Sequence, residues 1–258
     1  MNTLRILLIL FTHELRILAI SIPTYVAGAV FLTLMGGLYW FALLVSTSER
    51  EYTPLEGWFH LFALPLFFIV PLLTMRSFAE ERRLGTLGAL FSTPVRPLQV
   101  VLAKFSAAYA LYLLLWTLAL LFPLLAWWGL GSHGQHNDPR LLPVPTLVGG
   151  YIFVVASGAL HVSVGILASS LTRSTFVAAL LTFCALFLLV TIGNLLGRIP
   201  FATYSWTSFL QSPSEYLDTF KHLDVFLRGI VDTRPLFFFA SGTLLALGLT
   251  TLSVESKT

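Results

Sequence analysis

The chain has 258 residues, of which 57% are hydrophobic and only 10% are charged, whereas soluble domains average about 25% charged residues. A soluble fold has no place to bury this much apolar surface, so the composition excludes one and predicts an all-α integral membrane protein. The length suits one domain over residues 1–258, with about six spans of roughly 20 residues each. We interpret the net charge of +3 through the asymmetry of the loops rather than as a signal for nucleic acid. The single cysteine, Cys184, excludes an internal disulfide.

The first 21 residues predict an amphipathic helix that lies in the membrane interface. Apolar residues recur at helical spacing from Leu4 to Ile22, while His13 and Arg16 fall elsewhere around the helix. A cleaved signal peptide fits less well, because no small-x-small cleavage site follows the apolar run and charged residues come directly after it. We therefore expect the basic side chains of residues 1–21 to face phosphate headgroups.

Six predominantly apolar segments are predicted to span the bilayer. They are residues 22–45, 57–74, 100–128, 146–171, 175–196 and 236–252. Pro65 and Pro71 are expected to kink the second span, because each proline removes a backbone donor, and Pro97 is well placed to open the helix of the third. The amphiphilic residues 198–235 predict one or two short helices at the outer surface.

The charges of the connecting segments predict the orientation of the chain. The proposed inner segments hold nine basic and four acidic residues, whereas the proposed outer segments hold six basic and eight acidic residues. Because cytoplasmic loops carry an excess of Lys and Arg, both termini are expected in the cytoplasm. The predicted location is a bacterial-type inner membrane, crossed several times.

Residues 75–104 form the one long charged interruption in the apolar half of the sequence. Its charged members are Arg76, Glu80, Glu81, Arg82, Arg83, Arg96 and Lys104. A charge at the bilayer centre costs about 2.5–3.5 kcal/mol on insertion scales, so this segment must lie outside the lipid, between the second and third spans. Residues 78–91 can form a helix that Thr93-Pro94 ends, and Lys104 is expected to snorkel from the base of the third span. The mixed charges suit a polar interface with a soluble partner, and a solvated inner loop is the alternative that the residues leave open.

Other classes of function find less support in the sequence. The chain has no GxxxxGK[ST] and no GxGxxG after a strand, so any ATP that drives it must bind another chain. No predicted span carries an acidic residue near its middle, where ion-coupled carriers usually place ionisable groups.

Metal and protease chemistry are also weighed on the residues. His133, His136 and Asp138 share an outer loop and could hold a metal weakly, although a solvated loop explains them better. Ser157 with His161 suggests an intramembrane serine protease only faintly, because both lie on one helix instead of converging from two. Glu80-Glu81 is similar to the paired glutamates of intramembrane metalloproteases, but Gly85 stands where an arginine is expected.

The sequence resembles the ABC-2 type transporter permeases over nearly its whole length. The similarity is carried by M-R-S-F-A-E-E-R-R-L-G-T-L from residue 75, then S-T-P-V and V-L-A-K-F, by E-L-R-I-L-A-I-S-I-P-T-Y near the N-terminus, and by S-P-S-E-Y-L-D-T-F with L-R-G-I-V-D near the C-terminus. Together these runs look closest to the gliding-motility-associated and nitrous-oxide-accessory branch of that family. The residue after Leu87, usually acidic in relatives, is Gly88 here.

The resemblance implies a permease subunit, not itself an enzyme, with a coupling helix in its first inner loop. The residues expected to dock into an ATP-binding-cassette ATPase subunit are Phe78, Ala79, Glu80, Glu81, Arg82, Arg83, Leu84, Gly85 and Thr86. The permease itself is expected to hold no cofactor or metal, since ATP and Mg²⁺ would be bound by that partner. A second permease chain, identical or closely related, is also implied, and export is the expected direction. An intramembrane protease and a structural membrane subunit without a transport path remain the alternatives.

Overall fold

The computed structural model describes residues 3–48, 53–86, 95–130, 142–198 and 218–256. In these ranges the regular elements are all helices: α1 (Thr3–Ile20), α2 (Ile22–Ser48), α3 (Pro54–His60), α4 (Ala63–Thr74), α5 (Ala79–Leu84), α7 (Pro97–Ala119), α8 (Leu121–Leu130), α9 (Val144–Leu171), α10 (Thr175–Arg198), α12 (Thr219–Leu227) and α13 (Thr233–Glu255). The prediction of an all-α chain is therefore confirmed for the described residues.

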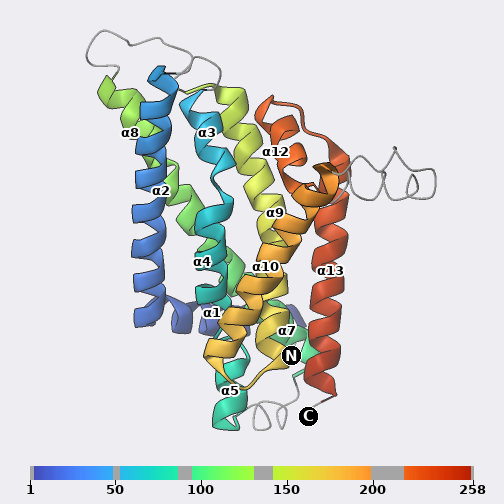
Figure 1. The fold of residues 1–258 in the computed structure, drawn as a ribbon. Helices are drawn as coiled ribbons and strands as arrows, with labels where there is room; N and C mark the ends of the chain where they lie inside the picture. The colour runs from blue at the N-terminus through green and yellow to red at the C-terminus, as the bar shows by residue number, and fades with distance from the viewer. Residues whose placement is uncertain (1–2, 49–52, 87–94, 131–141, 199–217, 257–258) are drawn as a thin grey trace, which may run out of the picture.

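The long helices run side by side along one axis, and α1 lies across one end of them (Figure 1). The start of α1, the charged helix α5 and the end of α13 all lie at this same end, the lower one in the figure. We call it the α5 end. The predicted helix of residues 1–21 is thus present as α1, and its crosswise position suits a helix in the membrane interface.

Five helices in the described part of the chain are long and apolar enough to cross a membrane. They are Ile22–Ser46, Ala63–Leu84, Pro97–Gly129, Val144–Leu171 and Thr233–Glu255. The predicted fifth span, residues 175–196, corresponds to α10, in which a shorter apolar helix, Thr175–Thr191, is found. The structure thus supports a multi-pass membrane protein, and the sixth span stays a prediction.

Two predicted spans are each divided into two helices. The second span is broken at Leu61 and Phe62, where Leu61 N–H and Phe62 N–H bond three residues back to Trp58 and Phe59. Pro65 follows directly and has no N–H to donate to Leu61, which explains why the regular pattern stops there. The third span changes from α7 to α8 at Leu120. The prediction that Pro97 opens this helix is confirmed, because α7 begins there.

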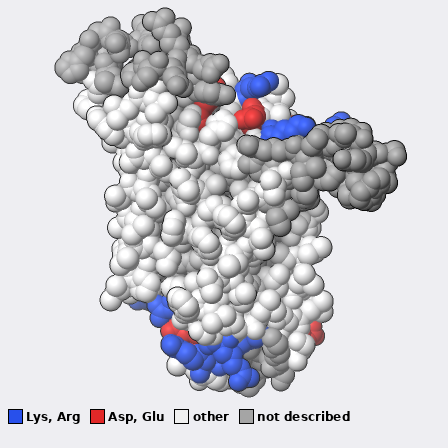
Figure 2. All heavy atoms as spheres, in the orientation of Figure 1, with Lys and Arg blue, Asp and Glu red and all other residues white. Residues whose placement is uncertain are grey.

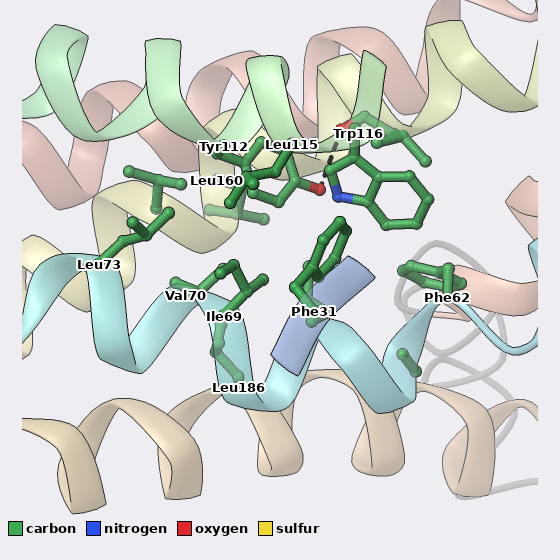
Figure 3. Packing of buried hydrophobic residues seen from close by; sticks show 14 of the residues in the cluster. Phe31, Phe62, Ile69, Val70, Leu73, Tyr112, Leu115, Trp116, Leu160 and Leu186 are labelled. Atoms are coloured by element: carbon green, nitrogen blue, oxygen red, sulfur yellow. Dashed lines mark hydrogen bonds between the residues drawn. The ribbon is translucent and has the colours of Figure 1, made fainter. Parts of the chain in front are cut away.

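The helices α4 and α9 lie at the centre of the bundle. In the apolar stretch of each helix that could cross a membrane, 61% of the residues are buried in Ala63–Leu84 and 67% in α9, against 28% in α2. Phe31 of α2, Val70 of α4 and Trp116 of α7 belong to one buried cluster (Figure 3). The rings of Phe31 and Trp116 meet edge to face at 5.5 Å, a favourable arrangement for aromatic pairs. This core fixes the position of α4, and therefore of α5, which follows it.

The amphiphilic segment before the last span contains α12, as expected. Asp218 caps this helix by accepting hydrogen bonds from Phe220 N–H and Lys221 N–H. Its other end packs on α9, where Thr146 donates a hydrogen bond of 3.0 Å to the carbonyl of Leu227. The remainder of the predicted outer helices, at residues 199–217, lies outside the described residues.

Candidate functional site

The charged helix α5 continues from α4 and ends at a glycine in the left-handed conformation. Gly85 has φ = 72°, which residues with a Cβ rarely adopt. Thr86 N–H bonds to the carbonyl of Glu81, and Gly85 N–H bonds to that of Arg82, which together form a Schellman motif. The predicted helix over residues 78–91 is therefore too long at its C-terminal end, because Gly85 ends it; residues 87–91 lie outside the described residues.

The charges of α5 agree with its helix dipole. Glu80 and Glu81 stand in the first turn, and Arg82 and Arg83 in the last, the distribution that the macrodipole favours. Residues 63–84 are long and apolar enough as a whole to cross a membrane. Within them, however, four of the six residues of α5 are charged, whereas α4 is apolar. We therefore place α5 outside the lipid.

A serine of α9 holds the start of α5. Ser169 Oγ accepts hydrogen bonds from Phe78 N–H at 3.1 Å and Ala79 N–H at 3.2 Å, and donates one to the carbonyl of Met75 at 3.2 Å. Backbone N–H groups at a helix start have no partner within the helix. The side chain of Ser169 supplies that partner from a different helix and so joins α5 to α9.

Lys104 of α7 joins α5 to α1. Its ammonium lies 2.7 Å from Glu14 of α1 and 2.7 Å from Glu81 of α5, and also sits over the ring of Phe78 at 5.4 Å from the centroid. The side chain is only 3% exposed, so the expectation that it snorkels into water is wrong. Two carboxylates satisfy the buried ammonium in place of water, which burial of a charge requires.

Arginines on either side of the two glutamates complete the attachments of α5. Arg76 binds Glu80 through two contacts, Nε to Oε2 at 2.6 Å and Nη2 to Oε1 at 2.8 Å. Arg82 Nη2 donates to the carbonyl of Ser253 at 3.2 Å. Because Ser253 belongs to α13, the six residues of α5 are tied directly to α7, α9 and α13, and through Lys104 to α1.

The two adjacent glutamates have opposite pKa shifts. The hydrogen bond from Arg76 lowers the pKa of Glu80. Burial raises the pKa of Glu81, and this outweighs the opposing effect of Lys104, in keeping with the cost of removing a carboxylate from water. One oxygen of Glu81, Oε2, is buried without a hydrogen-bond partner in the described part of the chain.

The nine residues predicted for docking lie together in one segment but differ in exposure. Phe78 and Ala79 are fully buried, and Glu80, Glu81 and Arg82 are partly buried. Exposed are Arg83, Leu84, Gly85 and Thr86, with 63% of Leu84 accessible. We call residues 83–86 the exposed strip of α5.

Sequence reasoning missed two residues that position α5, Glu14 and Ser169. It also missed that Lys104 is buried and paired. Glu14 is the first acidic residue of the chain and the only one before Glu49, a signal that could have suggested a buried partner. No pattern distinguishes Ser169 from its neighbour Ser170.

The described residues do not assemble a protease or metal site. Ser157 and His161 are fully buried in α9, and their side-chain polar atoms find no hydrogen-bond partner in the described ranges, not even each other. Glu80 and Glu81 are occupied by basic side chains, and no group of three metal-ligating residues occurs in the part of the chain that was described. The loop residues His133, His136 and Asp138 lie outside the described residues.

The helices and the charged α5 end define a multi-pass membrane protein with a charged helix outside its apolar spans. Residues 57–252, from α3 to near the end of α13, match the family model of ABC-2 family transporter proteins. The chain therefore belongs to the ABC-2 family, whose members are the transmembrane, non-catalytic components of ABC transporters and associate with an ATPase subunit. Comparison with curated proteins finds no match.

Proposed function

We propose that this chain is an export permease whose α5 receives the movement of a separate ATPase subunit. The observation that carries the proposal is the combination of four attachments with an exposed strip. Residues 83–86 offer one cation, one apolar side chain and an exposed turn at the α5 end, which suits a polar, reversible interface. Four of the other five predicted residues, Phe78, Ala79, Glu81 and Arg82, hold α5 to the bundle, so force applied at the strip reaches the spans.

Movement of α5 would tilt several helices together. Ser169 links α5 to α9, Lys104 links it to α7 and α1, and Arg82 links it to α13. ATP and Mg²⁺ are bound by the partner, and closure of the ATPase would move these helices as a set. Two permease chains, identical or closely related, would enclose the transport path, and both termini would lie in the cytoplasm. The resemblance in the segment from residue 75 supports placement in the gliding-motility and nitrous-oxide-accessory branch.

Docking and transmission can be tested with separate variants. Leu84→Asp changes the exposed strip and should reduce copurification of the ATPase subunit at least tenfold. Leu171→Asp is the control, because it makes the same substitution at a leucine of α9 that is 55% exposed. It should leave copurification of the ATPase subunit unchanged. Wild-type copurification of Leu84→Asp would show that the ATPase docks elsewhere.

Ser169→Ala tests transmission without changing the exposed strip. It leaves Phe78 N–H and Ala79 N–H without their acceptor, so the ATPase should still copurify while its stimulation by the permease falls severalfold. Ser170→Ala is the matched control, because the Ser170 hydroxyl donates only to Leu167 within α9. Equal stimulation in the two variants would contradict the role of Ser169.

Stimulation also separates a permease from a structural subunit. A permease should change the ATPase rate of the partner when a transported compound is added, and a structural subunit should not. The assay compares the reconstituted complex with and without candidate compounds.

A further inference from the structure

A cavity of about 820 Å³ lies between α1, the junction of α4 and α5, and the base of α7. Its volume is within the roughly 300–1,000 Å³ of small-molecule sites. The cavity is at the α5 end, where Figure 2 shows charged side chains below a broad uncharged belt. In a membrane this boundary is where headgroups meet acyl chains.

The walls of the cavity are apolar on one side and charged on the other. Ile17, Ile20 and Ile22 line it from α1 and the start of α2, with 53%, 64% and 78% of each side chain exposed. His13 and Arg16 share a face of α1 with Ile17 and Ile20, because these positions are three, four and seven residues apart. A ligand with a charged head and apolar tails fits such walls.

Among the charged groups that line the cavity, one cation is unpaired and one buried carboxylate oxygen has no hydrogen-bond partner within the described ranges. Arg76 is bound to Glu80, and Lys104 is bound to Glu14 and Glu81. Arg16 makes no hydrogen bond or ion pair with any described residue and is exposed. Glu81 Oε2 has no partner among the described atoms although it is buried. An unpaired buried carboxylate oxygen is costly, so a donor at this place would be stabilising.

We propose that this cavity binds the phosphoethanolamine headgroup of a phospholipid of the inner leaflet. The phosphate accepts hydrogen bonds from the Arg16 guanidinium, as phosphates commonly do. The primary ammonium donates to the carboxylate of Glu81, a side chain that lines the cavity and is 27% exposed, after this side chain turns Oε2 toward the headgroup. The acyl chains follow Ile17, Ile20 and Ile22 into the bilayer. A bound lipid of this kind would fill the space between α1 and α5 beside the ion pairs of Lys104.

The same contacts predict which headgroups are excluded. A choline headgroup has a quaternary nitrogen without N–H and cannot donate to Glu81. A glycerol headgroup has the phosphate and hydroxyl donors but no cation, so its hydrogen bond to the carboxylate is weaker than that of an ammonium. Free phosphoethanolamine has both charges but no acyl chains to cover the three isoleucines, so it should bind much more weakly than the lipid.

The test is calorimetric titration of the full-length chain in a non-ionic detergent with short-chain phospholipids. Phosphatidylethanolamine should bind at least tenfold tighter than phosphatidylcholine, phosphatidylglycerol or free phosphoethanolamine. Arg16→Ala should weaken that binding at least tenfold, whereas Arg5→Ala, an exposed arginine of the same helix that does not line the cavity, should leave it unchanged. Glu81→Gln should reduce the preference for ethanolamine over choline.

Several outcomes would overturn the proposal. Equal affinity for the three lipids would show that the cavity does not discriminate between headgroups. Equal affinity for free phosphoethanolamine and for the lipid would assign the cavity to a soluble ligand. Equal binding by Arg16→Ala and Arg5→Ala would place the lipid elsewhere. Because Arg16 is exposed and unpaired, its substitution should leave folding intact, which circular dichroism checks. No ATPase subunit is present in this assay, so its result is independent of the proposed docking.

Discussion

Lys104 illustrates how a buried charge can be both costly and structurally decisive. Removing an ammonium from water costs several kcal/mol, and attraction to carboxylates repays this only with close geometry. Both of its contacts are 2.7 Å long, and Glu14 and Glu81 come from helices far apart in sequence. The three residues therefore fix where α1 and α5 lie relative to α7.

Removing the amine should destabilise the fold more than removing any exposed charge of α5. Lys104→Met leaves two carboxylates without their cation, and we expect a loss of about 3 kcal/mol, the lower end of the range for broken buried pairs, because 27% of Glu81 remains exposed. The midpoint of thermal unfolding in detergent measures it. Arg83→Met is the control, since its contact to Glu80 is 3.7 Å long and 57% of its side chain is exposed; equal midpoints for the two variants would contradict a structural role for Lys104.

For individual residues, the sequence predicted which segment forms the candidate site, but it did not predict the contacts that each residue makes. The charges of residues 75–104 predicted that the segment leaves the lipid, because a run of charges is visible in the composition and is costly in a bilayer. Which charges pair depends on tertiary contacts, and Glu14 lies 90 positions from Lys104. Ser169 acts through its position beside Phe78, which no local pattern reveals.

At the scale of helices, α9 packs closely on its neighbours because it presents glycines to them. A Cβ at Gly149 would overlap the carbonyl oxygen of Phe226 in α12, and one at Gly158 would overlap the ring of Tyr112 in α7. Small residues allow such close approach between helices in membranes. The position of α12 against α9 therefore depends on Gly149, where the obstacle is backbone that cannot rotate away.

Gly149→Ala should displace α12, whereas the same change on an open face should not disturb the bundle. The variant should lower the thermal midpoint and increase the access of a water-soluble reagent to a cysteine placed at Leu227. Gly37→Ala is the control, because nothing lies within 4 Å of a Cβ there, and alanine favours a helix interior over glycine. The prediction is wrong if Gly149→Ala and Gly37→Ala unfold at the same temperature.

The positions of the helices were predicted well, and their interruptions less so. Each predicted span overlaps helices of the structure, namely α2, α3–α4, α7–α8, α9, α10 and α13, because long apolar runs have few alternatives to a helix. Only five helices of the described residues are long and apolar enough to cross a membrane, so the six-span layout stays a prediction. Pro65 correctly indicated a disturbed second span, although a complete break at Leu61 was not expected. The change at Leu120 did have a local signal, because Pro123 has no N–H to donate to the carbonyl of Ala119, where α7 ends.

At the scale of the whole molecule, charge is confined to the two ends of the bundle. Figure 2 shows basic and acidic side chains at both ends of the visible face, separated by an uncharged surface. The α5 end also contains the start of α1 and the end of α13 (Figure 1). This arrangement agrees with an even number of crossings and with the excess of basic residues predicted for the cytoplasmic side.

Cysteine labelling tests this orientation directly. In a Cys184→Ser background, Thr86→Cys and Ser256→Cys should react with a membrane-impermeant maleimide only in inside-out vesicles. Arg234→Cys, at the opposite end before α13, should react only in right-side-out vesicles. Labelling of Thr86→Cys from outside the cell would remove α5 from the reach of any intracellular ATPase and would contradict the proposed function.

The shortness of α5 has a practical consequence for attempts to inhibit the protein. A free peptide copying residues 79–86 would be a poor decoy, because isolated helices shorter than about 12–15 residues are marginal in water. In the intact chain Ser169, Lys104 and Arg82 hold this segment in shape. A competitor for the same ATPase surface would have to be grafted onto a rigid miniprotein scaffold that supplies equivalent supports.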